Sequence, residues 1–565
     1  MDNYVLEKSL EDQDNTFNIQ GSQLIYAPDM NNGGYQSGQI QFDLTTFSNG
    51  GRYLDFKNSF ITIPLVMTLS GSFVQTKENA FAMSLKNGVH QLINGISIVL
   101  SNNEVVSNQP FTNLHVNYKI LSSFSTTDVE NWGPTLLFEK DTSQSQTWNG
   151  GVVGTSVGTN NGIGISNNNI YGNTGSNISV FNPANGDFIP ENTGRAKRML
   201  HTSWNYADNT MNAWSGWTPA TQNPILPSAG NVATVAKNGV VTNNTTLIQY
   251  NILATIPLKF LHDFFDKCPL QKGGYFKLIL NTNTPATSTI TYNATPQVTN
   301  VVNITPYQQL PFQISPIAIT ASSNTGLVVA TASTSMVANL SIVKNSNGLG
   351  TSHPFSTCRF YGRCLDLAPS FESHYLSNPI KTVRYNDMIS YYTSATSNIS
   401  SGNQCQTTLT QSLARLRKLY IFPFFNSSSN GGISPLQSPF ASEPATCSPY
   451  AWVSQLQVFL SQVPIYPEPK TYRFLNFLEE SHGGNSIDGS LVNSLSGGLL
   501  NQHDYDTTYG VVVIDLSRHD VSQDDIAKSV GIQFTNLSPV AMDYICLIEF
   551  QREININCES GSLVL

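Results

Sequence analysis

Short stretches in which apolar and polar residues alternate recur along most of this chain, and they restrict its fold more than any other feature. Ile40 and Phe42 alternate with glutamines, and residues 61–65 (ITIPL) follow the same period of two. Residues 96–100 and 104–106 are two strand-like runs joined by a Ser-Asn-Asn turn, which predicts a β-hairpin. A period of two is typical of strands that bury one face. The pattern therefore predicts a protein built mainly of β-sheet.

The composition indicates a large, weakly charged β protein. Only 12% of the 565 residues are charged, with 28 Lys and Arg against 37 Asp and Glu, and 40% are apolar. Low charge together with 29 Phe and 23 Tyr excludes charged intrinsic disorder. No apolar run is long enough for a membrane helix. Residues 1–14 lack the apolar segment of a secretion signal.

Helical patterns are scarce, and the two best candidates resemble each other. We expect helices over residues 258–267 and 472–480, each after a strand-like run. Each candidate contains a basic residue followed by Phe and Leu, at Lys259-Phe260-Leu261 and at Arg473-Phe474-Leu475, which are 214 residues apart. Each is also followed by a glycine pair, Gly273-Gly274 and Gly483-Gly484, and these pairs are 210 residues apart. Two anchors at nearly one offset favour two copies of one architecture, although chance in a Gly-rich chain is an equal alternative on this observation alone.

Strands interrupted by short helices and long loops favour the jelly roll, in which eight strands form two packed sheets. The predicted fold class is therefore all-β, with two tandem eight-stranded jelly rolls, short helices and long loops. We expect an N-terminal segment at 1–35, a first jelly roll at 36–300 and a second at 301–565. A long loop should interrupt the first roll at about 140–245, because residues 142–186 are uncharged and rich in Gly, Asn, Ser and Thr.

Candidate catalytic patterns are weak. Residues 154–158 (GTSVG) match the nucleophile-elbow pattern, but no helix is predicted after them, so chance explains the match better. His482 precedes a glycine pair that we interpret as a helix C-cap. Glu479 and Glu480 are predicted to lie on the solvated end of a helix. We therefore predict no catalytic residue and no enzymatic activity.

Metal, cofactor and disulfide sites are also weakly indicated. His353, Cys358 and Cys364 lack the short Cys-x-x-Cys spacing and an evident fourth ligand, so a zinc site is not predicted. Seven cysteines, an odd number, do not indicate a disulfide framework and favour folding in a reducing cytoplasm. No cofactor is predicted.

Sequence-specific binding of nucleic acid is not indicated either. Residues 1–38 hold six acidic residues and one Lys, the opposite of a phosphate-binding arm. Arg415, Arg417 and Lys418 form the only local basic cluster, and they alternate with apolar residues as in a strand. The cluster is better explained as the polar face of a sheet or as a subunit contact.

Six segments, taken in their order along the chain, resemble the major capsid proteins of polinton-like viruses and virophages. The resemblance spans roughly residues 35–555, without the loop at about 140–245, and no single motif decides it. The segments are 37–44 (SGQIQFDL), 51–55 (GRYLD), 61–65 (ITIPL), 256–259 (IPLK) with Phe264-Phe265 and 278–281 (LILN), 438–446 (SPFASEPAT) and 513–518 (VIDLSR).

The resemblance implies a double jelly-roll subunit that forms a homotrimeric, pseudo-hexagonal capsomer. Many such capsomers would contact one another in an icosahedral virion shell around a double-stranded DNA genome. A penton protein and minor capsid proteins are further implied partners, with a contact to an inner membrane left open, and the chain would be synthesised and assembled inside the host cell.

Two segments receive a predicted place in such a capsomer. The loop at 142–186 should crown the outward face, and residues 1–20 should lie beneath the capsomer, where Val5, Leu6 and Leu10 would form a short helix. The alternative function is a secreted or surface carbohydrate-binding or adhesive β-sandwich protein, which has a similar composition. Such a protein usually carries a secretion signal, which residues 1–14 do not show.

Overall fold

The structure of the protein is a computed structural model. It describes residues 18–48, 51–71, 81–101, 103–141, 198, 202–205, 210–213, 222–225, 246–292, 296–302, 309–316, 334–343, 353–393, 402–409, 412–425, 435–437, 439, 453–484, 498–517, 524–538 and 541–564. The predicted places of residues 1–17, of the loop at 142–186 and of the run at 154–158 lie outside the described residues.

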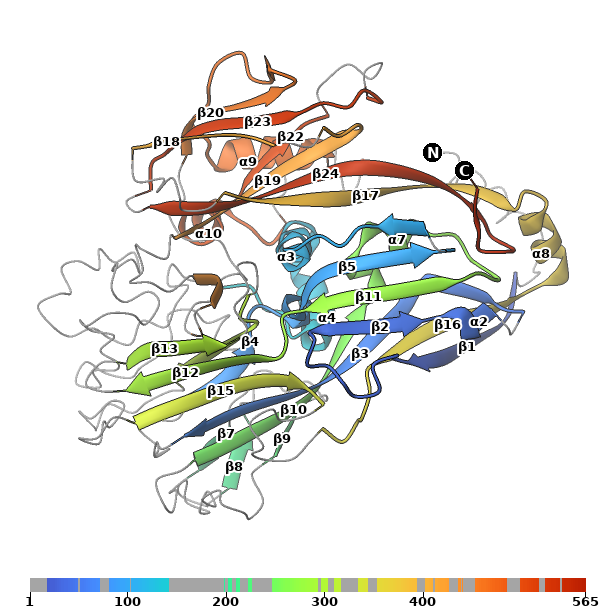
Figure 1. Ribbon diagram of the computed structural model, residues 1–565, viewed down its shortest axis with the longest axis horizontal. Coiled ribbons are helices and arrows are strands. Elements are labelled where there is room, and N and C mark those ends of the chain that lie inside the picture. Colours follow the sequence, from blue (N-terminus) through green and yellow to red (C-terminus); the bar gives the residue numbers. More distant parts are fainter. Residues whose placement is uncertain are drawn as a thin grey trace, which may run out of the picture.

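The first jelly roll, called roll 1, consists of eight antiparallel strands in two sheets (Figure 1). We number these eight strands one to eight along the chain. In the first sheet, called the β1 sheet, β1, β16, β3 and β10 lie side by side, which is the order one-eight-three-six. The sheet β2-β11-β5-β6 has the order two-seven-four-five. The strands are β1 (Ile19–Pro28), β2 (Gln39–Asp43), β3 (Tyr53–Gly71), β5 (Ile93–Leu100), β6 (Asn103–Val106), β10 (Thr246–Pro257), β11 (Phe276–Thr282) and β16 (Arg359–Leu367).

The second jelly roll, called roll 2, repeats this strand order. In one sheet, called the β17 sheet, the strands β17, β24, β19 and β22 have the order one-eight-three-six. In the other sheet, β18, β23, β20 and β21 have the order two-seven-four-five. This order is that of the jelly roll, so the prediction of two tandem jelly rolls is confirmed. The strands are β17 (Ile380–Thr393), β18 (Gln404–Thr408), β19 (Leu416–Phe425), β20 (Val453–Leu460), β21 (Val463–Pro464), β22 (Val512–Asp515), β23 (Val530–Asn536) and β24 (Met542–Asn557), to which β25 (Leu563–Val564) is added at the edge.

The turn between the fourth and fifth strands is the same in both rolls. Ser101 and Ser461 begin this turn with positive φ angles of 49° and 47°. The backbone N–H of Ser101 donates to the carbonyl of Tyr275 at 2.8 Å, and that of Ser461 donates to Ser529 at 2.9 Å. In each roll the acceptor directly precedes the seventh strand. The two rolls are therefore equivalent in detail as well as in strand order.

The anchors that we expected to mark the repeat are not equivalent. The first predicted helix follows β10, the sixth strand of roll 1, whereas the second follows the hairpin of the fourth and fifth strands of roll 2. Helix 258–267 is also two short helices, α6 (Leu258–Leu261) and α7 (Asp263–Lys267), with His262 between them in an extended conformation. Helix α9 (Phe474–Gly484) continues through the glycine pair that we expected to end it.

The described helices between the fifth and sixth strands are α3 (Thr112–Ser123) and α4 (Thr126–Leu136) in roll 1, and α9 and α10 (Gln502–Thr507) in roll 2. Shorter elements are α2 (Thr45–Ser48), η1 (Val89–Leu92), η7 (Pro435–Gln437) and α8 (Pro369–Leu376), which leads from roll 1 to roll 2. None of the helices in the described parts of the chain is long and apolar enough to cross a membrane.

Additional strands extend roll 1 and move its boundary. Strand β15 pairs with β3, β12 pairs with β15 and β13, and β14 pairs with β4. The first roll therefore runs to Leu367, and the boundary expected at 300/301 moves to α8. Strand β1, expected in a separate N-terminal segment, pairs with β16 inside roll 1. The additional strands are β4 (Phe81–Leu85), β7 (Thr202–Asn205), β8 (Thr210–Ala213), β9 (Gln222–Ile225), β12 (Ala286–Tyr292), β13 (Pro296–Val302), β14 (Phe312–Pro316) and β15 (Thr334–Ile342).

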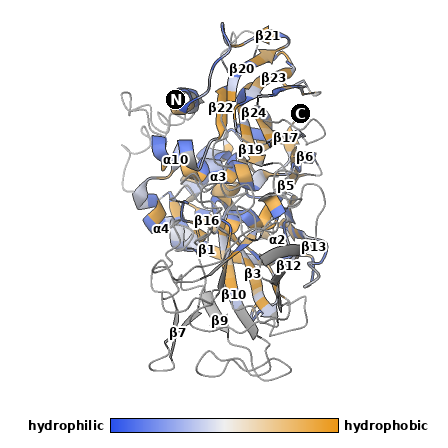
Figure 2. Ribbon diagram, turned by 90° about the vertical axis from the view of Figure 1, so that its left-hand side faces the viewer, coloured by the Kyte–Doolittle hydropathy of each residue, from blue (hydrophilic) through white to orange (hydrophobic). Residues whose placement is uncertain are grey.

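The predicted alternation of buried and partly exposed residues is clearest in the seventh strands, β11 and β23. Both alternate between buried and half-buried residues along their whole length. Figure 2 shows apolar residues along β3 and β10 of roll 1 and along β22 and β24 of roll 2. Most of the buried apolar side chains of the two rolls form one continuous hydrophobic cluster, and Tyr53, Leu365 and Leu367 form a smaller, separate one. Because each buried aliphatic side chain contributes about 1.5–3 kcal/mol, the larger cluster holds the rolls together as well as each roll by itself.

Candidate functional site

Buried polar side chains gather where the rolls meet. Here the β17 sheet of roll 2 packs against α3, α6, α7 and β6 of roll 1, and we call this contact the junction (Figure 1). None of its residues was expected from the sequence to form a functional site. The geometry of the junction determines how the two lobes of the chain are held relative to each other.

Glu549 on β24 is a buried carboxylate of the junction. Its oxygens accept hydrogen bonds from Tyr420 Oη at 2.5 Å and Asn386 Nδ2 at 2.9 Å, and Lys119 Nζ on α3 lies 3.5 Å away. Burial by itself would raise the pKa of Glu549, but the charge of Lys119 and the Tyr420 hydroxyl help to lower it to about 2. Glu549 is therefore ionised at neutral pH, and roll 1 supplies a compensating charge.

His115 on α3 faces the same carboxylate without being charged. Burial lowers its pKa to about 3, and the nearby charge of Lys119 acts in the same direction. The imidazole packs edge-on against the ring of Tyr420, with the ring centres 5.3 Å apart, and Tyr118 contacts the same ring at 4.9 Å. Two side chains of α3 thus enclose a tyrosine of roll 2.

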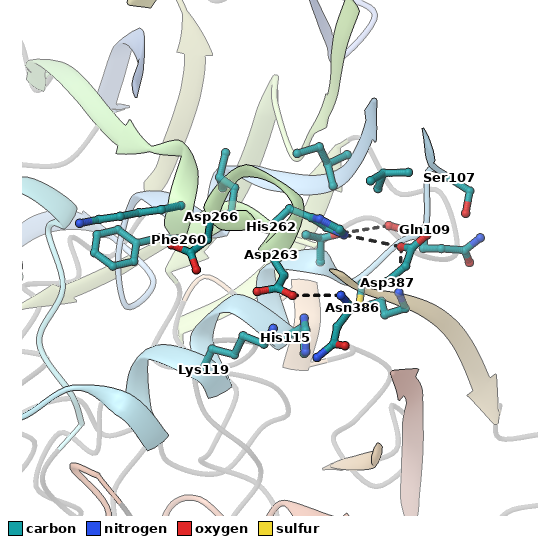
Figure 3. Close-up of a pocket in the computed structure, with 16 residues that line it drawn as sticks. Ser107, Gln109, His115, Lys119, Phe260, His262, Asp263, Asp266, Asn386 and Asp387 are labelled. Atoms are coloured by element: carbon teal, nitrogen blue, oxygen red, sulfur yellow. Dashed lines mark hydrogen bonds and ion pairs between the residues drawn. The ribbon is translucent and has the colours of Figure 1, made fainter. Parts of the chain in front are cut away.

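Asp387 on β17 forms a second centre. Arg552 Nη1 lies 2.9 Å from one carboxylate oxygen. His262 Nε2 lies 3.6 Å from the other (Figure 3). Burial acts to raise the pKa of Asp387, but the neighbouring His262 imidazole and the charge of Arg552 bring it below its usual value. Arg552 also donates to the carbonyl of Val105 on β6 at 2.8 Å, and Tyr385 donates to the same oxygen.

The edge of the β17 sheet is closed by roll 1. Strand β17 is the edge strand, and the backbone N–H of Asn386 donates to Asp263 Oδ2 on α7 at 3.0 Å (Figure 3). A cavity of about 130 Å³ remains beside these groups, lined in part by Lys119, His262 and Asp266. Because an open strand edge invites pairing with other chains, the carboxylate of Asp263 protects this one.

A further part of the junction joins the helices of both rolls. Tyr118 Oη on α3 lies 3.1 Å from Ser481 Oγ on α9, and Lys418 Nζ donates to the carbonyl of Ser481 at 3.0 Å. Burial lowers the pKa of Lys418. Lys140 of roll 1 forms an ion pair of 2.6 Å with Asp504 on α10. The Tyr118–Ser481 contact and the Lys140–Asp504 ion pair fix roll 2 against roll 1, whereas the bond from Lys418 lies within roll 2.

The C-terminal turn closes the junction at its other end. Ser101 Oγ donates to the carbonyl of Gly561 at 2.9 Å. Gly274 and Gly561 have positive φ angles, and a Cβ added to Gly274 would lie 2.7 Å from Gly561 Cα. The pair Gly273-Gly274, expected to mark the repeat, instead lets two turns approach closely.

The basic residues of the predicted cluster, Arg415, Arg417 and Lys418, all lie in roll 2. Arg415 pairs with Asp525 and Glu553, and Arg417 with Asp524, all inside roll 2. Lys418 points into the junction. The basic cluster is therefore committed to contacts within the chain.

Glu480, expected on a solvated helix end, is buried, which corrects that prediction. It accepts hydrogen bonds from Tyr466 Oη and from the backbone N–H of Asp515, both at 3.0 Å. Its neighbour Glu479 is exposed, as expected.

The three residues weighed as zinc ligands are bound up in separate contacts. His353 Nδ1 accepts from the N–H of Phe355 at 3.0 Å. The N–H of Cys358 donates to Asp29 Oδ2 at 2.9 Å, and burial raises the pKa of the Cys358 and Cys364 thiols. Within the described ranges, no group of three or more His, Cys, Asp or Glu residues is arranged to hold a metal ion.

Comparison with known proteins gives structural matches only. No family model and no curated protein matches the chain. A chain of the Sputnik virophage structure has 13% identity and a TM-score of 0.46, covering 98% of this chain and 90% of that one. The mavirus major capsid protein has 10% identity and a TM-score of 0.41, covering 99% and 92%. PBCV-1 VP54, fitted into a reconstruction of Sputnik, has 8% identity and a TM-score of 0.36, covering 98% and 99%.

Proposed function

We propose that this chain is a major capsid protein that forms a homotrimeric, pseudo-hexagonal capsomer of an icosahedral virion. The observation that carries the proposal is the strand order of the jelly roll, found twice in one chain and locked by the buried junction. Because a fold alone does not determine function, the proposal also rests on the six segments that resemble virophage and polinton-like virus capsid proteins.

The junction supports a structural role. A shell tile has to present its two lobes in one fixed relation, and buried, hydrogen-bonded ion pairs favour a single arrangement of the parts they join. Three copies of a two-lobed chain present six similar lobes, so one tile meets six neighbouring capsomers. In this proposal the protein is not an enzyme.

The remaining partners in the proposal follow from the sequence resemblance. They are a penton protein at the vertices, minor capsid proteins and an enclosed double-stranded DNA genome, which the protein would not bind through sequence-specific contacts. The protein would be made in the host cell and would reside in the virion.

The mass of the purified protein in solution tests this proposal. Light scattering coupled to size-exclusion chromatography should give three times 61.8 kDa, or larger particles. Negative-stain electron microscopy should show hexagonal outlines. A monomer at all concentrations, with binding to immobilised glycans, would contradict the proposal and favour the adhesive alternative.

A further inference from the structure

We infer that the exposed side of the β1 sheet in roll 1 binds roll 2 of a second copy of this chain, beside β21. The inference rests on the proposed function, because it assigns the contact that joins subunits in the trimer. It predicts that the contact between chains repeats the junction that already exists within each chain.

The exposed side of the β1 sheet carries a row of aromatic residues. Tyr26 on β1, Tyr361 on β16 and Phe60 on β3 are opposite one another in the strand register. The rings of Tyr361 and Phe60 stack at 4.9 Å, and Tyr26 lies 5.9 Å from Tyr361. Tyr26 is 55% exposed and Leu24, on the same side of β1, is 52% exposed. A contiguous apolar surface of this kind is typical of an interface.

Two arginines border this row. The guanidinium of Arg359 lies over the ring of Tyr26 at 4.9 Å, and its Nε is buried without a hydrogen-bond partner. Arg363 is exposed and donates to Ser22 Oγ at 3.2 Å. Neither arginine forms an ion pair with any residue that the structure describes. We call Leu24, Tyr26, Phe60, Arg359, Tyr361 and Arg363 the aromatic face, which offers apolar contact and two guanidinium groups.

The equivalent sheet of roll 2 is covered by roll 1. There Tyr420 and Tyr385 are fully buried, and both contact roll 1 through α3 or β6. The junction therefore joins two different surfaces, the β17 sheet of roll 2 and the side of roll 1 that carries β6 and the β10–β11 connection. A contact between unlike surfaces can be repeated from copy to copy, and three repeats close a ring.

Roll 2 presents the surface that such a repeat requires. The equivalents of β6 and of the β10–β11 connection are β21 and the β22–β23 connection. Val463 on β21 is 65% exposed, and Ile526 in the connection is 57% exposed. The hydrogen bond from Ser461 to Ser529 holds these two segments together. Glu468 and Asp525 are exposed acidic residues of the same segments. We call Val463, Glu468, Asp525 and Ile526 the β21 surface.

The charge of the two rolls favours this pairing. Residues 18–368 contain 17 Lys and Arg against 15 Asp and Glu, a formal net charge of +2. Residues 369–565 contain 10 against 17, a formal net charge of −7. In a ring that alternates roll 1 and roll 2, each contact between chains joins opposite net charges, whereas a contact between two copies of roll 2 would bring two acidic lobes together.

Substitutions on both surfaces test the inference. Tyr26→Ser with Arg363→Glu changes the aromatic face, and Val463→Ser with Asp525→Arg changes the β21 surface. Each double variant should raise the concentration at which trimers dissociate by about tenfold or more, because exposed aromatic and arginine anchors dominate interface energies. The control Leu475→Ser alters a side chain on α9 that is 60% exposed and lies in neither surface, so it should leave the trimer unchanged.

Light scattering over a dilution series reads out the result, and thermal unfolding checks that each variant is folded. If the wild type is trimeric and either double variant is folded and remains trimeric to the same dilution, the inference is overturned while the proposed function stands. A wild type that is monomeric overturns both. If one double variant does not fold, the other still decides, because the inference requires both surfaces.

Discussion

The β1 sheet and the β17 sheet have the same strand order but opposite surroundings. In the eighth strands, β16 of roll 1 mostly alternates between buried and partly exposed residues, whereas β24 of roll 2 is buried without interruption from Met542 to Glu549. The difference arises because roll 1 covers the β17 sheet, while nothing among the described residues covers the outer side of the β1 sheet at Leu24 and Tyr26. Equivalent strands thus carry different sequences, since a strand buried on both faces favours a continuous apolar run and a half-exposed strand does not.

The largest expected effect comes from Glu549, which belongs to the covered sheet. Glu549→Ala should destabilise the protein by about 3–5 kcal/mol, because Lys119 and the Tyr420 hydroxyl lose a buried partner. Urea unfolding measures the change. The matched control is Glu553→Ala on the same strand, whose ion pairs with Arg384 and Arg415 are half-exposed and worth about 1 kcal/mol or less. Equal effects of the two substitutions would mean that the junction does not enclose Glu549.

The two sheets can be compared with one substitution of the same kind in each. Tyr420→Phe removes the hydroxyl that donates to Glu549 at 2.5 Å and should cost about 1–3 kcal/mol. Tyr26→Phe, in the exposed sheet, should change stability by about 0.5 kcal/mol or less. Urea unfolding of both variants in parallel provides the measurement. A cost for Tyr26→Phe as large as that for Tyr420→Phe would contradict the difference in burial.

The pH dependence of stability reports the covered sheet through His115. Its pKa is lowered to about 3 in the folded state, so the unfolded chain binds this proton first as the pH falls below about 6.5. Stability is therefore fully present above pH 6.5, and His115 should remove about 1.4 kcal/mol per pH unit below that value. His115→Gln should reduce the slope of stability against pH between 6 and 5 by this amount. An unchanged slope would show that His115 is not buried in its neutral form.

The smallest effect is expected in the exposed sheet. Leu24→Ser should change the stability of the isolated subunit by about 0.5 kcal/mol or less, since more than half of this side chain is already exposed. Unfolding is measured below the concentration at which subunits associate. A loss above about 2 kcal/mol would mean that the β1 sheet is covered within the chain, as the β17 sheet is.

Local periodicity predicted the strands and the sandwich architecture, because the period of two at Ile40 or Phe42 reflects burial on one face. The repeat was predicted from the wrong anchors, since the long insertion before β10 shifts the later strands of roll 1 and hides the true equivalence of Ser101 and Ser461. The boundary at 300/301 was wrong because β12 to β15 are an excursion before the eighth strand, and sequence spacing does not tell an excursion from a linker.

The junction was not predicted, because its residues are brought together only by tertiary structure. Glu549 ends an apolar run and Asp387 precedes another, and in the sequence each looks like an ordinary polar residue at a strand end. Glu480 was assigned to a solvated helix end for the same reason. A single carboxylate inside or beside a strand that is apolar on both faces is the one sequence pattern that could have indicated a buried acidic residue. The pattern does not show which residues the carboxylate contacts.

A cryo-electron microscopy reconstruction of the purified, assembled protein would show which rolls meet between chains. We expect a closed ring of three chains in which roll 1 and roll 2 alternate, with Tyr26 of one chain beside Val463 of the next. A ring in which like rolls meet, or a two-fold dimer built on the β1 sheet, would contradict this arrangement.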